Sequence, residues 1–332
     1  MSQTIMEKEA AQAPSVIKEQ LISNQLLTAS IGKKLREIAP KMVMIIGRGS
    51  SDHAGVFGKY LIEIEAGVPV SSAAPSVASV YGKKLNLKDA LVIVISQSGR
   101  SPDIIAQAQM AKDAGAYCVA LVNDETSPLG EIVDDVLPLR AGAEISVAAT
   151  KSYLATLSAL VQLVANWTEN NELINALAEL PTAMEAIIDS PAQLTPESIA
   201  DVKNMVVLGR GLGFSISKEM ALKLKEVASI HAEAFSSAEF LHGPVTLVEQ
   251  GLAILNCAVT DESADSHQAQ IDEVIERGAD LVHLRQNNIL IHPRLAPLVV
   301  LQRFYLDVAK VAVSRGFNPD EPKGLKKVTR TL

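Results

Sequence analysis

Aromatic residues and long apolar runs are scarce in this 332-residue chain, and each scarcity excludes something. Aromatics make up only 4% of the sequence against 48% hydrophobic residues, so the core must consist of Ala, Val, Leu and Ile. That composition suits a parallel sheet covered by helices on both faces. No apolar run reaches the roughly 18 residues of a membrane span. The first thirty residues also show no signal-peptide pattern, so we expect a cytoplasmic protein without membrane contact.

Positive charge and cysteine are scarce as well. The formal net charge is −8, and no basic run is longer than Lys326-Lys327, which argues against a nucleic-acid binder. Any phosphate bound should therefore belong to a small molecule. Cys118 and Cys257 lie in apolar runs typical of buried strands, so neither a disulfide framework nor a thiolate metal site is expected.

A cluster of hydroxyl groups follows one apolar strand, in the segment 91–102 (LVIVISQSGRSP). Ser101 is placed as a helix N-cap with Pro102 at the first helical position. The N–H groups of that helix and the hydroxyls would face one space that fits a phosphate dianion, with no basic side chain needed in the loop. Gly99 would let the main chain approach the ligand. The alternative is a Ser-rich turn whose hydroxyls only cap the helix.

An internal repeat indicates the architecture. The segments 43–49 and 206–211 both read as strands that end in Gly-Arg-Gly before a helix. Only the first copy continues into a serine cluster. The second continues into the segment 260–265, whose carboxylates would repel phosphate. We expect an α/β chain with two tandem domains, 1–190 and 191–332, each a doubly wound parallel sheet flanked by helices.

Alternating apolar strands and helical stretches support this expectation. The predicted strands are Met42–Ile46, Leu91–Ile95, Tyr117–Val122, Met205–Leu208, Leu252–Val259 and Asp280–Leu284. One long helix or two are expected over 151–180, and a linker over 190–196. The turn 47–52 lacks the third glycine of a dinucleotide-binding motif, because Asp52 stands there, so no NAD is expected.

The second copy carries a further group of polar residues. Glu219, Lys223 and Glu226 are spaced to share one helix face. The simplest interpretation is a solvated face with a Glu–Lys pair. His242 precedes Gly-Pro at a break in helical periodicity, where a side chain could reach a cleft, although a lone histidine is more often structural.

Several strings together resemble the tandem sugar isomerase (SIS) domain family, as found in the isomerase half of glucosamine-6-phosphate synthase. They are Ser96–Gly99, Val147–Lys151, Ala221–Glu226, Ile230–Ala234, Leu241–Pro244 and Asn318–Thr329. The chain departs from the family pattern at Arg48, at Arg100 and at Ala149, where the pattern has serine. We also expect no glutaminase domain, and therefore no synthase activity with glutamine.

The resemblance implies roles for particular residues. The implied phosphate contacts are Ser51, Ser96, Gln97, Ser98 and Ser101. Glu226 would move a proton between C1 and C2, His242 would open the sugar ring, and Lys327 would reach the open sugar. The residues expected to orient these groups or to contact the sugar are Glu219, Lys223 and, through its backbone, Val147.

These roles imply a glucosamine-6-phosphate deaminase that releases fructose-6-phosphate and ammonia without metal or cofactor. The alternatives are a fructosamine-6-phosphate deglycase, a phosphosugar isomerase and, in another class, a sugar-phosphate sensor without turnover. The family further implies a homodimer with shared sites, in which His242 reaches the sugar of the neighbouring subunit.

Overall fold

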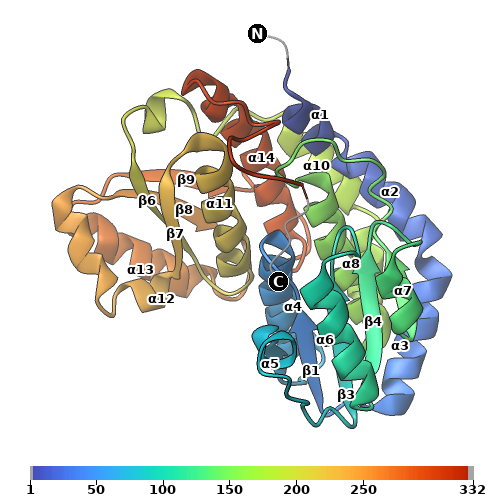
Figure 1. The fold of residues 1–332 in the computed structure, drawn as a ribbon. Coiled ribbons are helices and arrows are strands. Elements are labelled where there is room, and N and C mark those ends of the chain that lie inside the picture. The colour runs from blue at the N-terminus through green and yellow to red at the C-terminus, as the bar shows by residue number, and fades with distance from the viewer. Residues whose placement is uncertain (1–2, 328–332) are drawn as a thin grey trace. The chain divides into compact units, whose positions relative to one another are not determined.

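The computed structural model describes residues 3–327 and confirms the α/β class (Figure 1). Their strands form two sheets, and every strand pair is parallel. The first sheet contains β1 (Met42–Ile46), β2 (Val70–Ser72), β3 (Ala90–Ile95), β4 (Tyr117–Val122) and β5 (Asp135–Pro138), in the order β2-β1-β3-β4-β5. The second contains β6 (Asn204–Gly209), β7 (His231–Ser236), β8 (Ala253–Ala258) and β9 (Leu281–Arg285), in the order β7-β6-β8-β9. All six predicted strands are present within a residue or two, whereas β2, β5 and β7 were not predicted.

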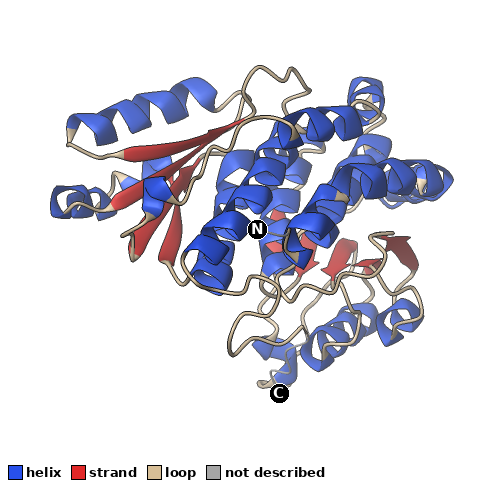
Figure 2. Ribbon diagram, turned by 90° about the horizontal axis from the view of Figure 1, so that it is seen from above, coloured by secondary structure: helices blue, strands red, loops and turns tan. Residues whose placement is uncertain are grey.

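Helices cover both faces of each sheet (Figure 2). On the first sheet, α4 (Ser50–Glu65) and α8 (Lys151–Trp167) pack on one face, since Gly58 lies against Ile45 and Leu160. The other face packs on α6 (Pro102–Asp113). One face of the second sheet packs on α12 (Ser237–Phe240) and α13 (Ala264–Glu276). Its other face packs on α11 (Leu212–Ala228), which also contacts α14 (Ala296–Ser314).

The remaining helices are distributed over the two units described below. They are α1 (Ile5–Ala11), α2 (Ala13–Ser23), α3 (Gln25–Ile38), α5 (Ser76–Ser79), α7 (Pro128–Ile132), α9 (Asn171–Leu177) and α10 (Leu180–Ile188), with 3₁₀ turns at Glu197–Ile199 and Pro244–Gln250. The stretch 151–180 therefore contains α8, α9 and the start of α10. Glu169 adopts a left-handed φ of 55°, and the side chain of Asn170 caps α9 by accepting the Leu173 N–H. No helix within residues 3–327 is long and apolar enough to cross a membrane.

The chain forms two compact units. The β1–β5 unit comprises residues 15–143, 152–178 and 326–327, and the β6–β9 unit comprises 3–14, 144–151 and 179–325. The predicted domain boundary at 190/191 stays a prediction. Both cysteines are buried and free, and burial raises the pKa of the Cys118 and Cys257 thiols to about 11 and about 12.

The two Gly-Arg-Gly turns have the same backbone conformation. Gly49 has φ 55° and ψ −127°, and Gly211 has φ 54° and ψ −127°. Each is the N-cap of the helix that follows. At the first glycine of each turn, Gly47 and Gly209, a Cβ would lie 2.7 Å from helix backbone. The sequence repeat is thus also a repeat of local structure.

Candidate functional site

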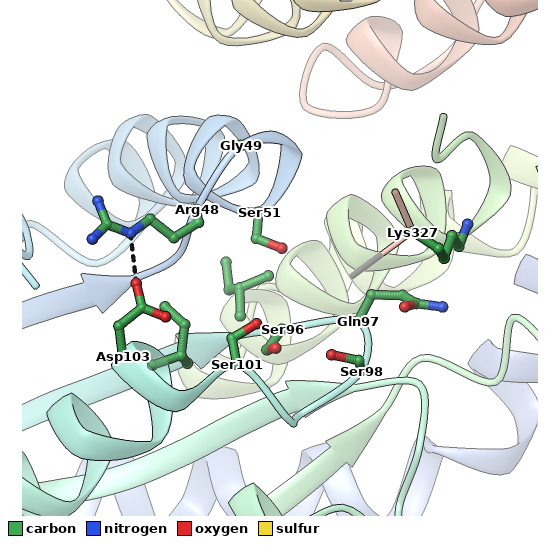
Figure 3. A pocket seen from close by; sticks show the side chains of 11 residues that line it. Arg48, Gly49, Ser51, Ser96, Gln97, Ser98, Ser101, Asp103 and Lys327 are labelled. Atoms are coloured by element: carbon green, nitrogen blue, oxygen red, sulfur yellow. Dashed lines mark hydrogen bonds and ion pairs between the residues drawn. The ribbon is translucent and has the colours of Figure 1, made fainter. Parts of the chain in front are cut away.

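A cavity of about 360 Å³ opens at the carboxyl ends of β1 and β3 (Figure 3). These adjacent strands lead into α4 and α6, which cover opposite faces of the sheet. The cavity therefore lies at the point where the strand order reverses, the usual ligand position in an open α/β sheet. Six predicted site residues line it, namely Ser51, Ser96, Gln97, Ser98, Ser101 and Lys327.

The serine hydroxyls gather around one space in Figure 3. Ser101 is the N-cap of α6 by backbone conformation (φ −70°, ψ 121°), but its side chain makes no capping hydrogen bond. The alternative in which the hydroxyls only cap the helix thus fails for Ser101. Ser96 Oγ accepts the Gly99 N–H at 3.1 Å, and Ser98 Oγ accepts the Arg100 N–H at 3.4 Å. Both hydroxyl hydrogens can still be directed toward a ligand.

Gly99 has a different structural reason from the one expected. Its φ is 60°, and a Cβ there would lie 2.1 Å from the Oγ of Ser127. Gly99 is also not part of the cavity lining. Packing against Ser127 and the left-handed backbone therefore account for glycine at this position.

Charged groups enter the cavity from outside the serine loop. Arg48, from the first Gly-Arg-Gly turn, and Asp103, from the first turn of α6, both line it, as does Lys327. Arg48 Nε lies 2.9 Å from Asp103 Oδ2. Arg100, which does belong to the loop, pairs instead with Asp124 at 2.7 Å. In the sequence, Arg48 stands out only as a departure from the family pattern, and nothing points to Asp103. The position of Arg48, directly after a strand at the ligand edge of the sheet, is the signal that could have identified it.

Glu219, Lys223 and Glu226 form a buried ionic group on α11, in the β6–β9 unit. Lys223 Nζ lies 3.2 Å from Glu219 Oε1 and 2.5 Å from Glu226 Oε2. The Lys223 and Glu219 side chains are 1% and 0% exposed, so the solvated-face interpretation is wrong. Tyr305 donates its OH to Glu219 Oε1 at 3.3 Å.

The electrostatics of this group favour an ammonium at Lys223. Burial alone would lower the pKa of Lys223, but the carboxylates of Glu219 and Glu226 outweigh burial and raise that pKa. Glu226 is 21% exposed, and Lys223 holds one of its oxygens. The result is a carboxylate in a fixed orientation that still reaches solvent, as a proton-transferring group requires.

Val147, also in the β6–β9 unit, lies in a segment that the Glu9 carboxylate and a backbone oxygen of Asp320 hold in place. Glu9 accepts the N–H groups of Ile145 and Ser146 at 2.5 and 3.1 Å. The Val147 N–H donates to the backbone oxygen of Asp320 at 3.0 Å. A backbone contact from Val147 to a sugar hydroxyl would therefore use its C=O.

His242 lies in the exposed turn after α12, where its N–H donates to the Glu239 oxygen at 3.0 Å. The structure thus groups the three α11 residues, and it places His242 and Val147 on separate segments of the same unit. Among the residues that the structure describes, no three His, Cys, Asp or Glu side chains are arranged to hold a metal ion.

The second sheet has a polar network near its Gly-Arg-Gly turn. Arg210 donates to Gln270 Oε1 at 3.2 Å, and Ser237 donates to the same atom at 2.6 Å. His267 is buried, with Nδ1 2.8 Å from Ser237 Oγ and Nε2 2.7 Å from Asn256 Oδ1. The polar groups of the second copy thus bind one another.

This network makes stability depend on pH through His267. Burial, and then the charge of Arg210, lower the pKa of His267 from 6.5 to about 4. The unfolded chain binds a proton in this window and the folded chain does not, so stability is lost as pH falls. We expect wild type to lose about 2 kcal/mol more than His267→Gln between pH 7 and pH 4.5. Urea unfolding of both proteins at the two pH values measures this, and equal losses would contradict it.

Comparison with known proteins places the chain in a family. The SIS domain model matches residues 38–166 and 198–290, and the chain belongs to this family. Glutamine–fructose-6-phosphate aminotransferase (isomerizing) of Clostridium tetani is 33% identical over 97% of this chain, confirming the resemblance, but the match spans only 58% of that protein.

Two solved structures share the fold over nearly their whole length. A Silicibacter pomeroyi protein, provisionally described as a phosphosugar isomerase, is 36% identical with a TM-score of 0.89, over 96% of this chain and 100% of its own. Glucosamine-6-phosphate deaminase from Thermotoga maritima has a TM-score of 0.77 over 99% and 100% of the two chains. At 21% identity, the second likeness shows the fold alone.

Proposed function

We propose that this chain is a phosphosugar enzyme that deaminates glucosamine-6-phosphate to fructose-6-phosphate and ammonia. The observation that carries the proposal is the cavity at the ends of β1 and β3, where four serine hydroxyls gather and Gln97 and Lys327 also belong to the lining. The half-buried Glu226 beside Lys223 supplies the acid/base group. The aminotransferase relative is named for transfer of an amino group to fructose-6-phosphate with isomerisation. That name supports an amino sugar phosphate as substrate.

The proposed chemistry divides between anchoring and proton transfer. The serine hydroxyls and the N-terminus of α6 bind the phosphate, and His242 helps to open the ring. Glu226 removes the proton from C2 of the open aldehyde and returns a proton to C1, while the C1 oxygen gains a proton and the C2 nitrogen loses one, which leaves a hydroxyl at C1 and an imine at C2. Water adds to this imine and expels ammonia, so the product is fructose-6-phosphate. Lys223 keeps Glu226 oriented, and no cofactor takes part.

Two enzyme alternatives use the same groups. A fructosamine-6-phosphate deglycase would take a substrate with its nitrogen on C1, and a phosphosugar isomerase would take one without nitrogen. The name of the Silicibacter pomeroyi protein favours the isomerase. A sensor would bind the sugar and leave it unchanged. The homodimer with shared sites also stays a prediction.

A substrate panel separates these functions. The purified protein is incubated with glucosamine-6-phosphate, a fructosamine-6-phosphate and fructose-6-phosphate, and ammonia and all sugar phosphates are quantified. A deaminase releases equal amounts of ammonia and fructose-6-phosphate from the first compound. Release of ammonia from the fructosamine-6-phosphate alone would indicate a deglycase. Conversion of fructose-6-phosphate without release of ammonia would indicate an isomerase, and binding without any product would indicate a sensor.

Ser98→Ala tests the phosphate contacts. It removes a hydroxyl that would bind phosphate in both the ground state and the transition state, so KM should rise more than kcat falls. Steady-state kinetics on glucosamine-6-phosphate measures both constants. Ser23→Ala, an exposed serine at the end of α2, is the matched control and should behave as wild type. A Ser98→Ala enzyme with unchanged KM would remove Ser98 from the site.

A further inference from the structure

The cavity contains a group that works against anion binding. Asp103 lines it, and its side chain is only 3% exposed. It also stands in the first turn of α6, so its carboxylate uses the helix N-terminus that a bound phosphate would use. A carboxylate beside a phosphate in a confined space costs binding energy, because little water screens the two charges.

Arg48 offsets this carboxylate. Its Nε lies 2.9 Å from Asp103 Oδ2, and its side chain is 52% exposed. In Figure 3 the guanidinium lies beside Asp103, away from the serine hydroxyls, and Lys327 lies on the other side of those hydroxyls. Arg48 is therefore placed to neutralise Asp103.

We propose that Arg48 is a positioning and specificity residue, which masks Asp103 and so permits a phosphate dianion to bind. Arg48, Asp103 and Lys327 are the charged side chains of the described lining, and together they carry one net positive charge. Loss of Arg48 cancels that charge, and loss of the Asp103 carboxylate doubles it. Loss of both restores the original value. This inference rests on the anion site of the proposed function, but it assigns a role to a pair which that function does not use.

Calorimetry with inorganic phosphate tests the pair without any sugar chemistry. At low ionic strength and about pH 8, phosphate is mainly a dianion and charge effects are largest. We expect Arg48→Ala to raise Kd about tenfold or more, and Asp103→Asn to lower Kd several-fold. The double variant Arg48→Ala/Asp103→Asn should return to within about threefold of wild type, and Arg48→Lys should keep most of the affinity. Thermal unfolding shows which variants are folded.

Each outcome decides something. If the double variant binds phosphate as weakly as Arg48→Ala does, Arg48 contacts the anion directly and the masking role is overturned. An unchanged Kd for phosphate in Arg48→Ala would also overturn it. If Arg48→Ala does not fold, the phosphate affinities of wild type, Asp103→Asn and the double variant are compared instead. An Asp103→Asn protein that binds phosphate no more tightly than wild type overturns the proposal. Wild type without phosphate binding would refute the anion site itself. If the phosphate affinities of the variants follow the expected order but the protein does not turn over glucosamine-6-phosphate, only the deaminase function is refuted.

Discussion

Replacing Glu226 with glutamine should lower kcat on glucosamine-6-phosphate by about 10²-fold or more and leave KM nearly unchanged. Glutamine keeps the shape of the side chain and can still accept a hydrogen bond from Lys223, whose Nζ lies 2.5 Å from Glu226 Oε2. It cannot take the proton from C2. Substrate binding is thus preserved while the transition state loses its base. Initial rates of ammonia release over a range of substrate concentrations measure both constants.

The matched control is Glu276→Gln, an exposed carboxylate at the end of α13. It makes the same chemical change far along the chain from α11, and it should retain wild-type kinetics. Near-normal turnover in Glu226→Gln would show that another group moves the proton. An equal loss in both variants would trace the effect to altered folding.

The second large effect concerns stability. Lys223→Met should reduce the free energy of unfolding by about 3–5 kcal/mol, because it leaves the carboxylates of Glu219 and Glu226 without their shared cation. Glu219 is completely buried, so water cannot take the place of the lost ammonium. Urea unfolding of wild type and variant at neutral pH measures the difference.

A second substitution separates charge from packing. Glu219→Gln added to Lys223→Met removes the buried carboxylate, and it should recover part of the lost stability. No recovery would mean that Lys223→Met acts through packing. A loss below about 1 kcal/mol in Lys223→Met would show that the ionic group contributes little to the fold.

The strands that the sequence predicts are those with continuous apolar runs. β3 and β4 are buried at every position, so hydrophobicity alone locates them. The three missed strands lie at sheet edges and are short or polar. β2 has three residues with two exposed serines, β5 contains Asp135 and Pro138, and β7 includes His231 and Glu233. Their strand conformation comes from pairing with a neighbour, which a sequence window does not contain.

The candidate site likewise has residues that local sequence predicts and residues that only the fold brings together. The serine cluster could be predicted because Ser96, Ser98 and Ser101 lie close together in the sequence and directly follow a strong strand. Periodicity placed Glu219 and Lys223 on one helix face, but it could not show that this face is buried, since strands β6 and β7 and helix α14 all pack on α11. The Arg48–Asp103 pair joins residues 55 positions apart, through adjacent strands, and only the fold brings them together.

Glucosamine-6-phosphate deuterated at C2 tests the central claim most directly. If Glu226 removes the C2 proton before ammonia leaves, the wild-type enzyme should show a primary isotope effect on kcat/KM. NMR should then find fructose-6-phosphate with the deuterium at C1 or exchanged into water, and one ammonia for each product molecule. Release of ammonia together with an aldose phosphate that keeps its deuterium on C2, or no conversion of this substrate at all, would contradict the account.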